Sequence, residues 1–252
     1  MFPGQALITG ISCSPPSSTK KTNRVLYPTS KGKIVKSRIT KASKLSLTAA
    51  LLGLCLTTPI FAGIHGNSHA FGKTIAAWNE IYERWAFGGL AIPIDRNGNA
   101  VVPPHVVLMP LPDAPGNGTP GHIDVTLNAG QAFVLPLWVL LGTDYTDGTP
   151  PDPLVDVSVF QTLDIAFQID GVTMIDNTNV PNFYSAFFFK RPISITNFPP
   201  IDSIIWFEGI GVVHHPLSVG THTLKLDAVN TQPAFRGFSE YHNTWSVTVL
   251  PQ

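Results

Sequence analysis

Apolar and polar residues alternate through much of the second half of the chain, and this period of two predicts β-strands. The alternation is clear where Ile123, Val125 and Leu127 are separated by polar residues. It is equally clear in LDIAFQID, where Asp170-Gly171 then supplies a turn. With the less regular apolar segments, the sequence predicts about seven strands, at 122–127, 132–141, 163–169, 184–189, 204–213, 221–229 and 243–250.

The segment AFVLPLWVLL, residues 132–141, differs from the others because its apolar residues are continuous. An uninterrupted apolar run of this length is typical of a strand that is buried on both faces. Pro136 lies inside the run and has no backbone N–H to donate to a neighbouring strand. We therefore expect an edge position or a β-bulge at Pro136.

The one clear helical pattern is TIAAWNEIYERW, residues 74–85. Apolar side chains recur there at a spacing of three or four residues, and Glu80 and Arg84 are placed to form an i,i+4 ion pair. The tryptophans Trp78 and Trp85 belong to this apolar stripe. We interpret the stripe as a packing face that docks the helix on the domain, rather than as an aromatic platform for a ligand.

The order of the elements favours an all-β fold, because strands do not alternate with helices as they do in parallel α/β sheets. We predict an antiparallel two-sheet sandwich, immunoglobulin-like or jelly-roll-like, with one N-terminal helix. Three parts are expected along the chain. They are a signal or targeting region (1–62), a helix with a Pro/Gly-rich lead-in (63–121) and the β-sandwich domain (122–252).

Charge is distributed unevenly, although the formal net charge of the 252-residue chain is zero. Nine of the 16 Lys and Arg residues precede position 45, and no acidic residue occurs before Glu80. The remainder carries seven Lys and Arg against all 16 acids, a net charge of −9. Because phosphate binding requires clustered basic residues, this acidic body argues against a nucleic-acid partner.

The basic head and the apolar run LSLTAALLGLCL, residues 45–56, have the layout of a secretory signal. The run is shorter than the roughly 20 residues of a membrane-spanning helix, so we expect no transmembrane segment in the mature chain. We place cleavage after Ala62, before Gly63, with Ala70 as the alternative. Lipidation of Cys55 is disfavoured because the bulky Leu54 precedes it. The protein is therefore expected to be secreted or periplasmic.

The first 44 residues are long for the charged part of a signal, and two explanations stay open. Translation starts further along the chain, or the head is a bipartite organelle address. Both cysteines, Cys13 and Cys55, lie in this head. The mature protein is therefore expected to contain no disulfide, no thiolate nucleophile and no cysteine-ligated metal.

Three histidines lie close together in HHPLSVGTHTLKLDAV, residues 214–229. The period of two places His222 on the face of Leu224 and Leu226, at the start of a core-facing row. His214 and His215 are adjacent, so in an extended segment they point to opposite faces and at most one can join His222. A zinc or copper site is conceivable here but needs a third ligand. We favour a structural role for all three.

Acidic residues suggest two further candidates. The loop GTDYTDGTPPDP contains Asp144 and Asp147, and calcium binds such clustered oxygen ligands, although the spacing fits no known calcium loop. A solvated turn is the favoured interpretation of this loop. Glu208 lies beside Trp206 and Phe207, where desolvation would raise the pKa of its carboxyl group. There is no G-x-S-x-G motif and no phosphate-binding glycine loop.

Several segments together resemble a group of uncharacterised secreted bacterial proteins. They are AAWNEIYERW, LNAGQAFVLPLW (127–138), DIAFQIDGV (164–172), PLSVGTHTL and the terminal WSVTV. The segment PLSVGTHTLKLDA is similar to the C-terminal hairpin of many bacterial immunoglobulin-like domains. The resemblance implies a secreted sandwich with a Trp-rich N-terminal helix, and it implies no particular activity.

The leading hypothesis is thus an exported, non-enzymatic binding or structural module with a protein or glycan partner. One alternative is a metal-dependent enzyme or metal-binding protein that uses the histidines of the C-terminal hairpin. The other is a calcium-stabilised extracellular module that uses Asp144 and Asp147. Zinc, copper or calcium is a possible cofactor under the two alternatives, and the sequence itself requires none.

Overall fold

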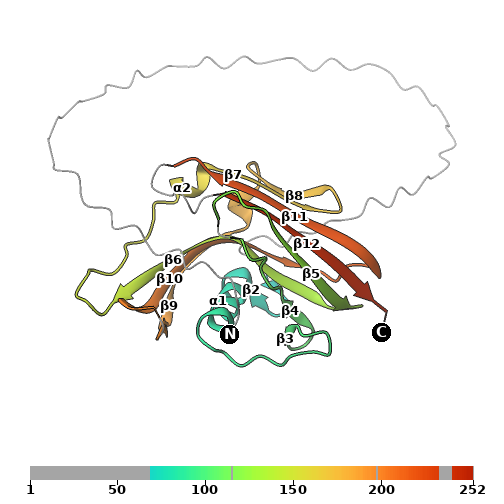
Figure 1. Ribbon diagram of the computed structural model, residues 1–252, viewed down its shortest axis with the longest axis horizontal. Coiled ribbons are helices and arrows are strands. Elements are labelled where there is room, and N and C mark those ends of the chain that lie inside the picture. The colour runs from blue at the N-terminus through green and yellow to red at the C-terminus, as the bar shows by residue number, and fades with distance from the viewer. Residues whose placement is uncertain (1–68, 115, 197, 233–239, 252) are drawn as a thin grey trace, which may run out of the picture. The chain divides into compact units, whose positions relative to one another are not determined.

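The computed structural model describes residues 69–114, 116–196, 198–232 and 240–251, which form two five-stranded β-sheets, a short two-stranded sheet and a covering helix (Figure 1). The expected cleavage site at Ala62 and Gly63 and both cysteines lie outside these residues. The first sheet has the order β3 (Ala100–Val102), β4 (Val106–Leu108), β6 (Ala132–Tyr145), β10 (Ile201–His214) and β9 (Tyr184–Ser194). The second has the order β5 (Gly121–Asn128), β12 (Glu240–Leu250), β11 (Gly220–Asn230), β7 (Leu163–Ile169) and β8 (Val172–Asp176).

The predicted all-β, two-sheet architecture is confirmed, and a strand is found at each of the seven predicted segments. The smaller elements were not predicted; they are β1 (His69–Ala70), β2 (Lys73–Thr74), β3, β4, β8, α2 (Ser158–Gln161) and the 3₁₀ turn η1 (Val180–Asn182). Because β3 and β4 join the first sheet, the lead-in 63–121 contributes strands to the sandwich as well as the helix.

The sheets are not purely antiparallel, and the prediction was wrong on this point. β4 pairs with β6 in parallel, and β5 pairs with β12 in parallel, whereas the other pairings between the described strands are antiparallel. In the first case β5 lies between β4 and β6 in the chain but belongs to the opposite sheet. This additional reversal of direction brings β6 back parallel to β4. Residue periodicity shows which face is buried and does not show strand direction.

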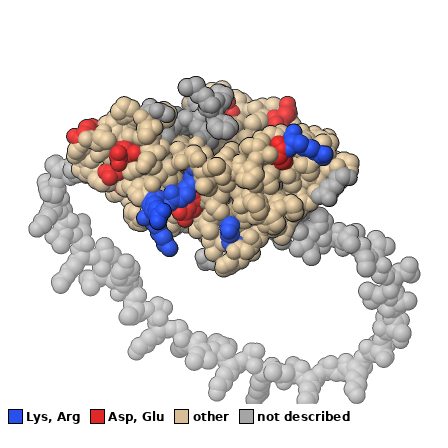
Figure 2. All heavy atoms as spheres, turned by 90° about the horizontal axis from the view of Figure 1, so that it is seen from below, with Lys and Arg blue, Asp and Glu red and all other residues tan. Residues whose placement is uncertain are grey.

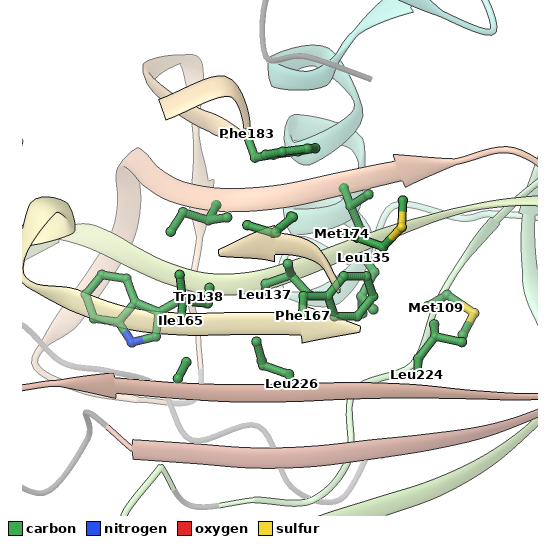
Figure 3. Close-up of a cluster of buried hydrophobic side chains, with 14 of the residues drawn as sticks. Met109, Leu135, Leu137, Trp138, Ile165, Phe167, Met174, Phe183, Leu224 and Leu226 are labelled. Carbon is green, nitrogen blue, oxygen red and sulfur yellow. The ribbon is translucent and has the colours of Figure 1, made fainter. Parts of the chain in front are cut away.

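The main core lies between the two sheets and is built from the alternating side chains of the facing strands (Figure 3). Ile165 and Phe167 of β7 and Leu224 and Leu226 of β11 meet residues of β6 such as Leu135. The other face of β11 is exposed or half-buried, in keeping with the alternating sequence. His222 lies on the predicted side of β11, in register with Leu224 and Leu226.

The helix α1 (Ile75–Ala86) covers the outer face of the first sheet. Ile75, Trp78 and Tyr82 are buried in a second cluster with side chains of β3, β4, β6 and β10, so the apolar stripe is a packing face as predicted. The predicted Glu80–Arg84 ion pair is present, at 2.9 Å. Since α1 lies on one face of β6 and the second sheet on the other, the continuous burial predicted for residues 132–141 holds for 132–138, whereas Val139 and Leu141 are half-buried.

Candidate ligand pocket and the predicted sites

A cavity of about 120 Å³ lies beside the part of β6 that has no paired strand on the β4 side. β4 pairs only with Ala132–Val134. Pro136 follows and offers no N–H, and Leu137 has no partner in the register with β10, which is the bulge expected from the sequence. Residues 109–114 continue towards β5 instead of extending the sheet. The space left beside β6 is the cavity.

The cavity is bounded by the C-terminal end of α1, the segment 111–114, β6 around Pro136 and the first half of β12. Two hydrogen bonds hold its walls in place. The Tyr82 hydroxyl donates to the Met109 carbonyl oxygen at 2.7 Å, and Trp245 Nε1 donates to the Pro110 carbonyl oxygen at 2.8 Å. The Met109 and Pro110 carbonyl groups lie just beyond the end of β4, where the pairing with β6 stops. Aromatic side chains of α1 and β12 supply their hydrogen-bond donors instead.

Among the residues that line the cavity, Glu83 is unusual because it is a buried acid. The whole residue is 3 % exposed, and desolvation alone shifts the pKa of its carboxyl group, without a contribution from a hydrogen bond or a charged neighbour. Burial raises the pKa of Glu83 to about 8, because the low-dielectric surroundings disfavour the ionised form. At neutral pH the side chain is therefore mainly a carboxylic acid, which can both donate and accept a hydrogen bond.

Asn243 supplies a second polar group from β12. It is 6 % exposed, and its Oδ1 atom is buried with no hydrogen-bond partner among the described residues. The backbone approaches closely at Gly121, its neighbour in the register, where a Cβ atom would lie 2.6 Å from Oδ1. A buried acceptor without a partner is rare and costly, on the order of 1–3 kcal/mol. A ligand with a donor group would satisfy it.

Sequence reasoning missed both residues, although α1 did contain a signal. Asn79 and Glu83 occupy the same helical stripe as Ile75, Trp78 and Tyr82, so they had to face the sheet. Asn79 satisfies one of its groups there, because its Nδ2 donates to Ser185 Oγ at 3.0 Å. An acid on an apolar helix face is the feature that would have identified Glu83. Asn243 gave no comparable signal.

The three candidate metal histidines each have local partners. His214 is buried, stacks on Phe133 with ring centroids 5.1 Å apart, and its Nδ1 lies 2.7 Å from its neighbour's carbonyl oxygen. His215 contacts Phe71 edge to face. His222 lies 2.6 Å from Asp170 through Nδ1 and 3.0 Å from the Ser218 carbonyl oxygen through Nε2. In the described part of the chain, no three His, Cys, Asp or Glu side chains are grouped to hold a metal ion.

The contact between His222 and Asp170 joins the β10–β11 turn to the β7–β8 turn. The hydrogen bond and charge of Asp170 outweigh the desolvation of His222 and raise the pKa of its imidazole above the usual value. We expect Asp170→Asn to lower the pKa of His222, measured by NMR titration of the ring protons. Asp124→Asn, which removes a carboxylate beside a different histidine, is the control and should leave His222 unchanged. An unchanged pKa in Asp170→Asn would contradict the contact.

The aspartates of the candidate calcium loop each accept a hydrogen bond from a nearby backbone N–H. Asp144 Oδ1 accepts from the Tyr145 backbone N–H at 2.9 Å, and Asp147 Oδ1 accepts from the Thr149 N–H at 3.0 Å. Asp147 is exposed in the bend that follows β6, as favoured from the sequence, whereas Asp144 lies within β6 and pairs with Ser203 of β10. Asp152 is directed back to β6, where it accepts from the backbone and hydroxyl of Thr143.

Glu208 is buried, as its sequence neighbours suggested, and desolvation raises the pKa of its carboxyl group. Its carboxyl group has partners, because it accepts a hydrogen bond from the Val155 N–H at 3.2 Å and one from the Tyr184 hydroxyl at 3.5 Å. It does not line the cavity beside β6. Glu208 therefore has a structural role, because its hydrogen bond to Val155 holds the segment before α2 against β10.

Charged side chains are sparse on the face seen in Figure 2, where blue and red atoms are scattered over a largely uncharged surface. No extended basic patch is visible on that face. Among the described helices, none is long and apolar enough to cross a membrane.

No protein-family model matches the chain, and no curated protein matches its sequence. Among solved structures, one similarity is to the crystal structure of the cysteine protease inhibitor EhICP2 from Entamoeba histolytica. The match has 15% sequence identity, covers 58% of this chain and 94% of the inhibitor, and has a TM-score of 0.18. At that TM-score the similarity supports no argument about fold or function.

Proposed function

We propose that this chain is an exported binding protein that takes a small, mainly apolar molecule into the cavity beside β6. The observation that carries the proposal is the pair of buried polar groups, the Glu83 carboxyl and Asn243 Oδ1, in an otherwise apolar cavity. Small-molecule sites combine an apolar lining with a few polar groups in this way. The basic head and its apolar run support export.

We propose an immunoglobulin-like type for the sandwich that carries this site. In the first sheet β6, β10 and β9 are neighbours in the order of immunoglobulin strands B, E and D. In the second sheet β12, β11, β7 and β8 follow the order G, F, C and C′. This order supports the immunoglobulin-like alternative over the jelly roll.

Binding is favoured over catalysis by the composition of the cavity wall. Acid–base and nucleophilic mechanisms combine an acid with a second acid, a base or an activated nucleophile. Among the described residues that line the cavity, Glu83 is the only acid, and no histidine, lysine, serine or threonine accompanies it. A single protonated carboxyl group in apolar surroundings is suited to hydrogen bonding with a bound molecule.

Toluene is a suitable probe of the cavity itself, because Trp138 and Trp245 line it and report on occupancy by fluorescence. We expect a saturable change in tryptophan fluorescence and a higher melting temperature with toluene, since a ligand bound by the folded state stabilises it. Ala114→Phe places a ring in the cavity and should weaken binding about tenfold or more, which is a loss of about 1.4 kcal/mol.

The matched control is Ala186→Phe, at an exposed position of β9 that does not line the cavity. It should bind toluene as the wild type does. A wild type that gives no saturable response, or an Ala114→Phe variant that responds equally, would refute the proposed site.

A further inference from the structure

We infer that the cavity selects a small neutral hydroxyl compound of the phenol class, whose hydroxyl oxygen accepts from the Glu83 carboxyl group and whose hydrogen is donated to Asn243 Oδ1. The inference rests on the proposed function, because it names the ligand class of the same cavity. It adds selectivity for a polar group to the binding of an apolar molecule.

The size of the cavity limits the ligand to about one ring. Its volume is about 120 Å³, and a dry apolar cavity of about 150 Å³ in another protein is known to hold benzene. Aromatic side chains from three elements line it, among them Tyr82, Trp138 and Trp245. Rings of this kind favour edge-to-face and offset contacts with a bound ring, worth roughly 0.5–1.5 kcal/mol per pair.

The two polar groups define what the ring must carry. Asn243 Oδ1 lacks a donor, and the protonated carboxyl group of Glu83 has a hydrogen to give. A hydroxyl group combines an acceptor and a donor in one atom, whereas an ether or a ketone offers no hydrogen to Asn243. A carboxylate would bring a negative charge into a cavity whose described lining contains no Lys, Arg or His.

A cationic ligand is disfavoured by the same surroundings. An ammonium group would require Glu83 to ionise, and a buried ion pair must overcome the desolvation of both charges. The two remaining titratable groups of the described lining are Tyr82 from α1 and Tyr241 from β12. Burial raises the pKa of both hydroxyls, so they stay neutral where Glu83 titrates. The neighbouring Arg84 is directed to Glu80 and to the Arg191 carbonyl oxygen.

Binding should therefore depend on pH through Glu83. Burial raises the pKa of Glu83 to about 8, so its hydrogen is present at pH 6 and mostly absent at pH 9. Once Glu83 is ionised, the single hydroxyl hydrogen of the ligand can be donated to the carboxylate or to Asn243 Oδ1 but not to both, so one of the two acceptors stays unpaired. An apolar ring of the same size makes no such polar contact to lose. Phenol itself stays mainly neutral up to pH 9, since a phenolic hydroxyl has a pKa near 10.

The test compares phenol with toluene on the full chain, by tryptophan fluorescence at pH 6 and pH 9. We expect phenol to bind about tenfold tighter than toluene at pH 6, and this preference to shrink at least threefold at pH 9. Glu83→Gln, whose amide donates at every pH, should keep the preference and lose its pH dependence. Glu83→Leu should lose the preference and still bind toluene. Glu208→Gln, the control at another buried acid, should behave as wild type.

Near-ultraviolet circular dichroism of each variant establishes that the fold is kept before binding is compared. Equal affinity for phenol and toluene in the wild type would overturn the ligand class and leave the proposed binding cavity standing. A phenol preference that Glu83→Leu retains would also overturn it, because the donor would then be another group. Failure of both probes to bind would refute the proposed function as well.

Discussion

Replacing Glu83 by Gln should make the protein more stable at pH 9 than the wild type, by several kcal/mol, and leave the two nearly equal near pH 5. The carboxyl pKa is raised from 4.5 to about 8 in the folded state. Between these values the folded state keeps a proton that the unfolded state releases, so the free energy of unfolding falls as pH rises. The slope is on the order of 1 kcal/mol per pH unit for one group.

Urea denaturation curves between pH 5 and pH 9 measure this slope. Other groups also titrate in the range, such as His214, whose pKa is lowered by burial, and His222, whose pKa is raised. They are common to both proteins, so the difference between wild type and variant isolates Glu83. Glu208→Gln should retain the Glu83 slope. If the wild-type and Glu83→Gln curves run parallel from pH 5 to pH 9, the buried acid is ionised in the folded protein.

Trp78→Ala should lower the free energy of unfolding by about 3–5 kcal/mol, the range for removing a fully buried aromatic side chain. The Trp78 side chain is 0 % exposed and lies at the centre of the contact between α1 and the first sheet. Its Nε1 also donates to the Ala70 carbonyl oxygen at 2.7 Å, which ties the strand pair β1–β2 to the helix. The change therefore removes packing and leaves a buried acceptor unsatisfied.

The control lies on the same helix. Trp85 is half-buried and belongs to the edge of the cluster, so Trp85→Ala should cost clearly less. Chemical denaturation followed by far-ultraviolet circular dichroism compares the two variants. A cost for Trp78→Ala as small as that of a surface substitution would mean that α1 does not form part of the cooperative fold.

The larger elements could be predicted because burial imposes a period on their sequences. Residues 163–169 and 221–229 alternate because each strand has one core face and one outer face. Residues 132–138 do not alternate because α1 and the second sheet cover both faces of this part of β6, and the half-buried Val139 and Leu141 pack in a third apolar cluster around Phe207. The pairing of β5 with β12 joins segments more than a hundred residues apart. No local pattern specifies such a pairing, and so the parallel pairs could not be anticipated.

The period that burial imposes on a sequence could predict neither the short elements nor the cavity. β3 and β4 have three residues each, too few to establish a period, and Pro103 and Pro104 stand between them. The cavity depends on where β4 stops pairing with β6, which is a property of the assembled sheet. The bulge was nevertheless anticipated from Pro136, because a residue without an N–H cannot continue a ladder.

The double coverage of β6 has a consequence for how the sequence can vary. In β11 and β12 every second position faces outward, so polar and charged substitutions can be accommodated at about half of the residues. In the stretch Ala132–Trp138 all seven positions are buried. Single substitutions by charged residues are therefore not tolerated in this stretch, and its sequence can change only by exchange among apolar residues of similar volume.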